Sequence, residues 1–270
     1  MSTINTNLSS LNAQRNITKS AGDLQNSMTR LSSGLRVNSA KDDAAGLSIA
    51  TKMDSQIRGM AQASRNANDG ISMIQTADGA LANISDATQR IRELAVQGAN
   101  GTNGTDEFTA INAEMSALSD EIDRIAKETK FNGDAVLGRA DVMIQVGADS
   151  ATGQQIAVAF EDTTAYVHTH TAVTDVASAN TALAAIDDKL KALNTERASL
   201  GTAQNRMGYA ISNLATSMEN QSAAKSRIMD TDYAAETSKL SRAQILQQAD
   251  TAMLAQANSA PNNVMSLLRG

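Results

Sequence analysis

The chain has 270 residues with 23 basic and 29 acidic side chains, so its formal net charge of −6 argues against nucleic-acid binding, which normally requires a basic face. It has no cysteine, which excludes disulfides, thiolate nucleophiles and thiolate metal sites. Hydrophobic residues make up 41% but aromatic residues only 2%, and this favours thin helical bundles over a compact globular core. No apolar run approaches the roughly 18 residues of a membrane span, and the polar start lacks the pattern of a cleaved signal peptide.

The first predicted helix covers residues 3 to about 35. Its apolar residues form a stripe with a slip of register before Ile17, and the stripe consists of Ile4, Leu8, Leu11, Ile17, Ala21, Leu24, Met28, Leu31 and Leu35. Alternating steps of three and four place such residues along one face of a helix, as in a coiled coil. Residues 33–46 contain Gly34 and Asn38-Ser39 and are predicted to form a joint, with Lys41-Asp42-Asp43 supplying salt bridges.

A helical hairpin is predicted next. A long helix runs from about Ala44 to the turn at residues 100–105, and a third helix follows to about residue 130. The repeating apolar residues are Met53, Ile57, Met60, Ser64, Ala67, Ile71, Leu81, Ile84, Thr88, Ile91 and Ala95, then Ile111, Met115, Leu118, Ile122 and Ile125. Gly59, Gly70 and Gly79 weaken the long helix, so we expect close backbone packing at each of them. Asp120–Arg124 and Asp123–Lys127 are predicted ion pairs of the third helix.

The middle of the chain changes period. Residues 131–133 (Phe-Asn-Gly) indicate a turn, and residues 142–146 and 156–160 predict a β-hairpin. Residues 161–178 have no clear period and are interpreted as a connector. His168 and His170 could share one face of a strand and hold a metal, but without supporting ligands two surface histidines are the preferred interpretation.

The most regular repeat lies near the C-terminus. A helix is predicted from about Ala177 to beyond Met218, with a seam of Leu183, Ile186, Leu190, Leu193, Arg197, Leu200, Gln204, Met207, Ile211, Leu214 and Met218. A second joint is predicted at residues 229–232. The last helix, from about Tyr233, is expected to bury Leu240, Leu246, Ala249, Met253 and Ala257 and to be interrupted at residues 261–263 (Pro-Asn-Asn).

The stripes at the two ends are too far apart in the sequence for their partners to be identified from spacing alone. Large apolar stripes rarely stay exposed, and short unpartnered helices fray. We therefore expect both ends to be disordered in the free subunit and to fold on assembly, when neighbouring subunits cover them.

Five segments closely resemble the signatures of bacterial flagellins. They are Ile4–Ala13 (INTNLSSLNA), Leu31–Ala50 (LSSGLRVNSAKDDAAGLSIA), Gln89–Gln97 (QRIRELAVQ), Arg227–Glu236 (RIMDTDYAAE) and Ala255–Arg269 (AQANSAPNNVMSLLR). The resemblance covers roughly residues 1–147 and 180–270. It implies a mainly α fold, a long coiled-coil helical rod with a small β-hairpin and with the N- and C-terminal helices paired.

The domains implied by the resemblance are an inner terminal coiled coil (1–45 and 226–270) and a helical rod (46–178 and 179–225), which includes a β-hairpin region at about 131–160 and a short connector at 161–178. Many flagellins insert outer domains after the hairpin. The short connector therefore implies a short form that lacks the outer variable domains.

The implied function is structural, with no enzymatic activity and no cofactor. Subunits would be exported unfolded by the flagellar type III pathway and would polymerise outside the cell into the hollow filament that serves as the motility propeller. The implied partners are further copies of the chain, the filament cap, the hook-junction proteins, an export chaperone and the host Toll-like receptor that senses flagellin. No nucleic acid or membrane is expected as a partner.

Two sets of site residues follow from the resemblance and the stripes. The recognition and inter-subunit residues are Gln89, Arg90, Leu94 and Glu114. The expected assembly seam consists of Ile4, Leu8, Leu11, Leu24, Met28, Leu31, Leu246, Met253, Val264, Leu267 and Leu268.

Three alternatives remain at this point. A hook–filament junction protein would share the rod plan but would not grow long filaments. A coiled-coil adaptor or signalling domain would form a small defined oligomer. An enzyme would need a catalytic region, and the short variable segment contains no metal-ligand helix motif.

Overall fold

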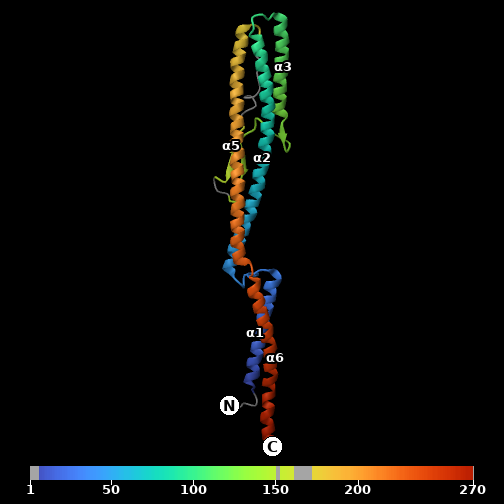
Figure 1. The fold of residues 1–270 in the computed structure, drawn as a ribbon, viewed down its shortest axis with the longest axis vertical. Coiled ribbons are helices and arrows are strands. Elements are labelled where there is room, and N and C mark those ends of the chain that lie inside the picture. Colours follow the sequence, from blue (N-terminus) through green and yellow to red (C-terminus); the bar gives the residue numbers. More distant parts are fainter. Residues whose placement is uncertain (1–5, 150–152, 161–171, 270) are drawn as a thin grey trace. The chain divides into compact units, whose positions relative to one another are not determined.

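The computed structural model describes residues 6–149, 153–160 and 172–269, with the side chains described up to residue 259. Helices dominate these ranges (Figure 1): α1 (Leu8–Ser33), α2 (Ala44–Gly98), α3 (Thr105–Glu128), α5 (Val176–Met229) and α6 (Tyr233–Arg269). Four short strands are present in two hairpins: β1 (Lys130–Phe131) with β2 (Asp134–Ala135), and β3 (Val142–Gln145) with β4 (Gln155–Val158). The mainly α fold predicted from the sequence is confirmed.

The chain divides into two compact units. The bundle unit comprises residues 56–219, and the terminal unit comprises residues 1–55 and 220–270. The division lies inside α2 and α5. The domain boundaries expected from the sequence, at 45/46 and 225/226, lie nearer the joints and stay a prediction.

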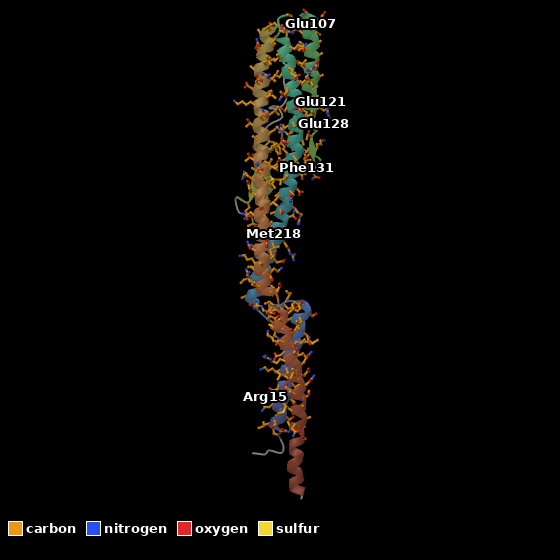
Figure 2. All side chains as sticks on the ribbon, in the orientation of Figure 1. Arg15, Glu107, Glu121, Glu128, Phe131 and Met218 are labelled. Atoms are coloured by element: carbon orange, nitrogen blue, oxygen red, sulfur yellow. The ribbon has the colours of Figure 1, made fainter. Side chains whose placement is uncertain are left out.

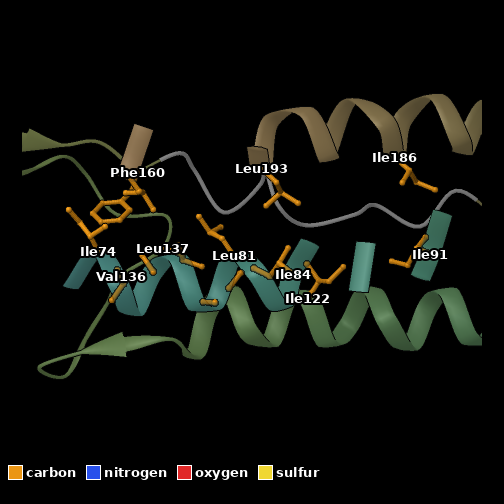
Figure 3. Packing of buried hydrophobic residues seen from close by; sticks show 14 of the residues in the cluster. Ile74, Leu81, Ile84, Ile91, Ile122, Val136, Leu137, Phe160, Ile186 and Leu193 are labelled. Atoms are coloured by element: carbon orange, nitrogen blue, oxygen red, sulfur yellow. The ribbon is translucent and has the colours of Figure 1, made fainter. Parts of the chain in front are cut away.

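The larger hydrophobic core of the bundle unit is built by α2, α3, α5 and the β3–β4 hairpin (Figure 3), and a smaller cluster of Met60, Ala63 and Leu214 lies further along α2 and α5. On α5, every seventh residue is buried along the line Ala179, Ile186, Leu193, Leu200, Met207 and Leu214. The intervening predicted seam positions, such as Leu183 and Leu190, are only partly buried. Ala182, Glu196 and Ala203 form a second buried line on α5. The buried face of α5 is therefore wider than the single stripe of a two-helix coiled coil, and its centre differs from the predicted seam.

The predicted repeat of α2 and α3 also lies in this core. Leu81, Ile84 and Ile91 of α2 are buried, and so are Ile111, Met115 and Ile122 of α3. Ile84 and Ile122, neither of which retains any solvent exposure, are seen close to each other in Figure 3. The third helix therefore packs on the second, as the antiparallel hairpin prediction requires.

The described strands of the middle segment form two hairpins. β3 and β4 are antiparallel with Val142 opposite Val158 and Gln145 opposite Gln155, which confirms the predicted β-hairpin. The predicted turn at Asn132-Gly133 connects β1 and β2, two strands that the sequence analysis did not identify. Both turn residues have positive φ, 53° and 92°, and this conformation suits Asn-Gly in a tight hairpin.

One side-chain amide fixes the segment that leads into α5. Asn112 of α3 donates from Nδ2 to the carbonyl of Val173 at 2.8 Å and accepts from the N–H of Val173 at 2.8 Å. Val173 is fully buried, and Phe160, which directly precedes the connector, is 7% exposed. The chain is therefore held against the bundle core at Phe160 and again at Val173.

The three glycines of α2 at which close packing is expected, Gly59, Gly70 and Gly79, differ in their surroundings. A Cβ at Gly59 would lie 2.9 Å from the Cβ of Ala148, and one at Gly70 would lie 2.9 Å from the Sδ of Met207. Close packing therefore explains these two. No atom outside the helix's own backbone lies within 4 Å of a Cβ built at Gly79, so the expectation of close packing there is wrong.

Of the two ion pairs predicted on α3, one is confirmed and the other is wrong. Lys127 contacts Asp123 at 2.6 Å, as predicted. Arg124 instead binds Glu121 at 2.5 Å and Glu128 at 2.9 Å, two acids that lie along the same helix (Figure 2). These hydrogen bonds raise the pKa of Arg124 above its ordinary value. Asp120 is not the partner, because the two glutamates already occupy the guanidinium.

In the terminal unit, α1 and α6 lie side by side and run antiparallel, since Ser27 contacts Glu236 whereas Ser10 contacts Asn258 (Figure 1). Both ends of the chain thus find a partner within one molecule. The expectation that they fold only on assembly stays a prediction.

The two predicted joints meet in this unit. The N–H of Arg36 donates to the carbonyl of Met229 at 2.6 Å, and the N–H of Thr231 donates to the carbonyl of Gly34 at 2.9 Å. We call this pairing of residues 34–37 with residues 228–231 the clasp. Gly34 ends α1 in the left-handed region, at φ 71°, where glycine carries no Cβ penalty.

The acids at the first joint bind backbone groups. Asp42 accepts hydrogen bonds from the hydroxyl and the N–H of Ser39, and these hold its pKa below the ordinary value. Asp43 accepts from the N–H of Gly46, in the first turn of α2. Both acids therefore cap turns, and their interpretation as salt-bridge material stays a prediction.

The last helix is longer than expected. The backbone of α6 continues through residues 261–263 to Arg269, so the predicted interruption at Pro261 is wrong. Proline fixes φ near the helical value, so the backbone can stay helical there, although Pro261 has no N–H to donate to the preceding turn.

Candidate assembly surface and recognition site

The seam between α1 and α6 is lined by small and polar residues. On α1, Ser10, Ala13, Ser20 and Ser27 are buried, each at 5–8% exposure. The hydroxyl of Ser27 donates to Glu236 at 2.7 Å, that of Ser20 to Asp250 at 2.6 Å, and that of Ser10 to the side chain of Asn258 at 2.7 Å. The helices are therefore joined through hydrogen bonds as much as through apolar contact.

Glu236 is the buried charge of this seam, with 4% of the residue exposed. Lys239 forms an ion pair with it at 3.0 Å. Burial raises the pKa of Glu236, but hydrogen bonds from Ser27 and Lys239 outweigh that effect and hold the pKa below its ordinary value. Glu236 therefore stays ionised at neutral pH within the seam.

The large apolar side chains of the same helices face outward. On α1, Leu8 is 65%, Leu11 48% and Met28 53% exposed. On α6, Leu246 is 47% and Met253 65% exposed. Ile245, at 66%, belongs with them, although the sequence analysis did not identify it because it lies beside the expected stripe. We call these six residues the outer apolar face.

The expected assembly residues thus fall into three groups. Leu8, Leu11, Met28, Leu246 and Met253 are exposed, whereas Leu24 and Leu31 are half-buried. Ile4 lies outside the described residues, and the side chains of Val264, Leu267 and Leu268 lie outside the described side chains. The expectation that α6 buries Leu246, Ala249 and Met253 is wrong, because Glu236 and Ala243 are the residues buried instead.

The expected recognition residues lie on α2 and α3 of the bundle unit. Arg90 binds Glu93 at 2.9 Å on its own helix and Glu114 of α3 at 2.9 Å. Hydrogen bonds from Arg90 to Glu93 and to Glu114 raise the pKa of Arg90, whose side chain is 50% exposed. Gln89 beside it is exposed. Arg90, Glu114 and Gln89 therefore offer polar groups to a partner.

Leu94 does not belong to that surface. It is 3% exposed and lies in the hydrophobic core of the bundle unit. The structure therefore corrects the grouping of Leu94 with three surface residues, because its side chain packs into the core of the bundle unit. Leu94 can affect a partner only by positioning the turn that carries Arg90.

The described residues contain no group of three or more His, Cys, Asp or Glu side chains that could hold a metal ion. His168 and His170 lie outside the described ranges. Within the described part of the chain, no helix combines the length and the apolar character needed to cross a membrane.

Comparison with known families gives two matches. Residues 4–141 match the bacterial flagellin N-terminal helical region, and residues 183–268 match the bacterial flagellin C-terminal helical region. Together these matches cover α1 to α3, nearly all of α5, and α6.

Individual relatives are similar along their whole length. The chain is 47% identical to a flagellin of Halalkalibacterium halodurans, over 98% of this chain and 99% of that protein. It is 45% identical to a flagellin of Xenorhabdus nematophila, over 99% of each, in an alignment of 311 positions that is longer than this chain. The crystal structure of Bacillus cereus flagellin, 34% identical, covers 56% of this chain and 88% of its own, with a TM-score of 0.50.

Proposed function

We propose that copies of this chain join through the outer apolar face. The chain belongs to the bacterial flagellin family and is a structural subunit of the flagellar filament, not an enzyme. The observation that carries this proposal is the orientation of the terminal helices. They turn serines and acids toward each other and leave six large apolar side chains in solvent.

Burial of this face by neighbouring copies would provide the driving force for polymerisation. The apolar residues of the face lie on two different helices, so one copy can present them to more than one neighbour. A head-to-tail contact whose rotation does not close produces an open helical polymer, and such a polymer around a channel is the filament proposed here.

Export is the second part of the proposal. Subunits leave the cell unfolded through the flagellar type III pathway, with an export chaperone, and assemble between the hook-junction proteins and the cap into the extracellular propeller. The absence of cysteine supports this route, because no disulfide can form before or during passage.

Seeded growth tests the assembly proposal. The purified chain, added to short filament fragments at neutral pH, is expected to extend them into long filaments visible by electron microscopy. A defined small oligomer in sedimentation, with no growth from seeds, would instead indicate the adaptor class of protein.

Recognition by the flagellin-sensing Toll-like receptor is the third part of the proposal. Arg90 supports it, because its guanidinium is half-exposed and its position is fixed by Glu93 and Glu114. Gln89 and Glu114 add hydrogen-bonding groups beside it. We propose that neighbouring subunits cover this surface in the filament, so that the receptor binds the free subunit.

Replacement of Arg90 by alanine is expected to weaken receptor binding by roughly tenfold or more, the scale of a lost charge-assisted hydrogen bond. Binding of the free subunit to the receptor ectodomain is measured by surface plasmon resonance. Arg92→Ala is the matched control, since Arg92 lies on the same helix and is 46% exposed but pairs with Asp187 of α5. Equal binding by free subunits and intact filaments would contradict the proposal.

A further inference from the structure

The residues of α6 that face α1 alternate between acid and alanine at every seventh position. The line is Glu236, Ala243, Asp250 and Ala257, of which the first two are buried and the last two half-buried. The facing line of α1 also repeats every seven residues, as Ala13, Ser20 and Ser27, and all three are buried.

Small residues that recur every seven positions do not by themselves fix how far one helix is shifted along the other. A slide of α6 by one heptad, about 10 Å at 1.5 Å per residue, again places small residues against small residues. The hydrogen bonds differ after such a slide. Natively both serines donate to an acid. Ser20 also lies one heptad from Ser27, opposite Ala243, so a slide in either direction brings only one of the two acids opposite Ser20. Ser27 then loses Glu236, and the other carboxylate is left without a serine donor.

We propose that Glu236 and Asp250 are positioning residues that set the register of α6 against α1. Polar groups at seam positions are known to fix register in coiled coils at a cost in stability. Because acid and alanine alternate, the pattern on α6 repeats only every fourteen residues. A shift of α6 by seven residues therefore costs hydrogen bonds that the native alignment has.

The register matters because the outer apolar face is built from both helices. A slide would shift Ile245, Leu246 and Met253 by about 10 Å relative to the apolar residues of α1, and neighbouring copies would meet a different surface. This consequence rests on the proposed assembly function, whereas the register itself is a property of one chain.

The clasp is the competing explanation. Its hydrogen bonds join residues 34–37 to residues 228–231 next to the Ser27–Glu236 contact. The Ser20–Asp250 contact lies further along the helices, beyond direct contact with the clasp. Substitution of Glu236 and Asp250 leaves the clasp residues unchanged. It therefore shows whether the acids or the clasp set the register.

The absence of cysteine allows a direct measurement by disulfide crosslinking. Ser10→Cys with Asn258→Cys reports the native register, because these two side chains are in contact at 2.7 Å. Ser10→Cys with Thr251→Cys, or with Met265→Cys, reports a slide of one heptad in either direction. Each pair is oxidised in free subunits and in filaments grown from seeds.

Glu236→Ala with Asp250→Ala is expected to lower the ratio of native to slipped crosslink by roughly tenfold or more. Glu236→Gln with Asp250→Asn keeps an acceptor at each position and is expected to retain the native product. Asp23→Ala removes an exposed acid of α1 and is expected to change neither product.

Two results would overturn the proposal. An unchanged native crosslink in the double alanine variant would show that the clasp alone sets the register. A joint loss of native and slipped products would show that the acids only hold the helices together. Failure of the parent chain to form filaments would count against the proposed function alone, because the crosslinks of free subunits still report the register.

Discussion

Glutamate at both Leu246 and Met253 is expected to stop filament growth while both helical units stay folded. In the single chain these side chains are 47% and 65% exposed, so a charge there remains solvated and costs the subunit little. On the proposed subunit contact, the same carboxylates would be buried without partners, at a cost of about 2 kcal/mol or more for each subunit added. Seeded elongation followed by light scattering and electron microscopy measures the effect, and circular dichroism measures the helix content.

Leu246→Met with Met253→Leu is the matched control, because it keeps the apolar character and nearly the volume of both side chains. This variant is expected to elongate seeds at close to the parent rate. Filaments of normal length from the glutamate variant would show that the outer apolar face is not the assembly surface.

Leu193→Ala is expected to lower the free energy of unfolding of the bundle unit by about 2–5 kcal/mol. Leu193 is fully buried on α5 within the core shown in Figure 3, and its truncation leaves a cavity that long, mutually packed helices cannot close. The measurement is the urea midpoint of the loss of helical circular dichroism.

Two further substitutions calibrate that measurement. Tyr209→Ala, on the same helix at a position that is 78% exposed, is expected to change the free energy by no more than about 0.5 kcal/mol. Gly79→Ala is expected to stabilise α2 by up to about 1 kcal/mol, since its Cβ would meet no atom outside the helix's own backbone. A loss for Leu193→Ala as small as that for Tyr209→Ala would contradict the core assignment.

Periodicity was sufficient to predict the long helices and both joints. The alternation of three and four residues requires only local geometry, and Gly34 and residues 229–232 interrupt it where the chain turns. The β3–β4 hairpin was equally predictable from its β-branched alternation. The strands β1 and β2, at two residues each, are too short to show a period.

The direction in which the terminal helices face was not predictable from hydrophobicity. An apolar stripe normally indicates the buried side, but in α1 and α6 serine and acid residues are buried and Leu8, Leu11 and Met253 are exposed. A subunit of a larger assembly buries its apolar side chains in contacts that its own chain does not contain. The family resemblance assigns Leu94 to the recognition residues, and only the tertiary packing shows that its side chain is buried.

The two anchors of the connector have a consequence for how chain length can change. Phe160 is nearly buried, and Val173 is held by both polar atoms of the Asn112 amide, so the chain leaves and re-enters the bundle at fixed points. For a flexible segment added between fixed ends, the entropic cost of closure grows only with the logarithm of its length, at about 0.6 kcal/mol for each doubling. Segments added between these anchors would therefore cost the bundle almost nothing.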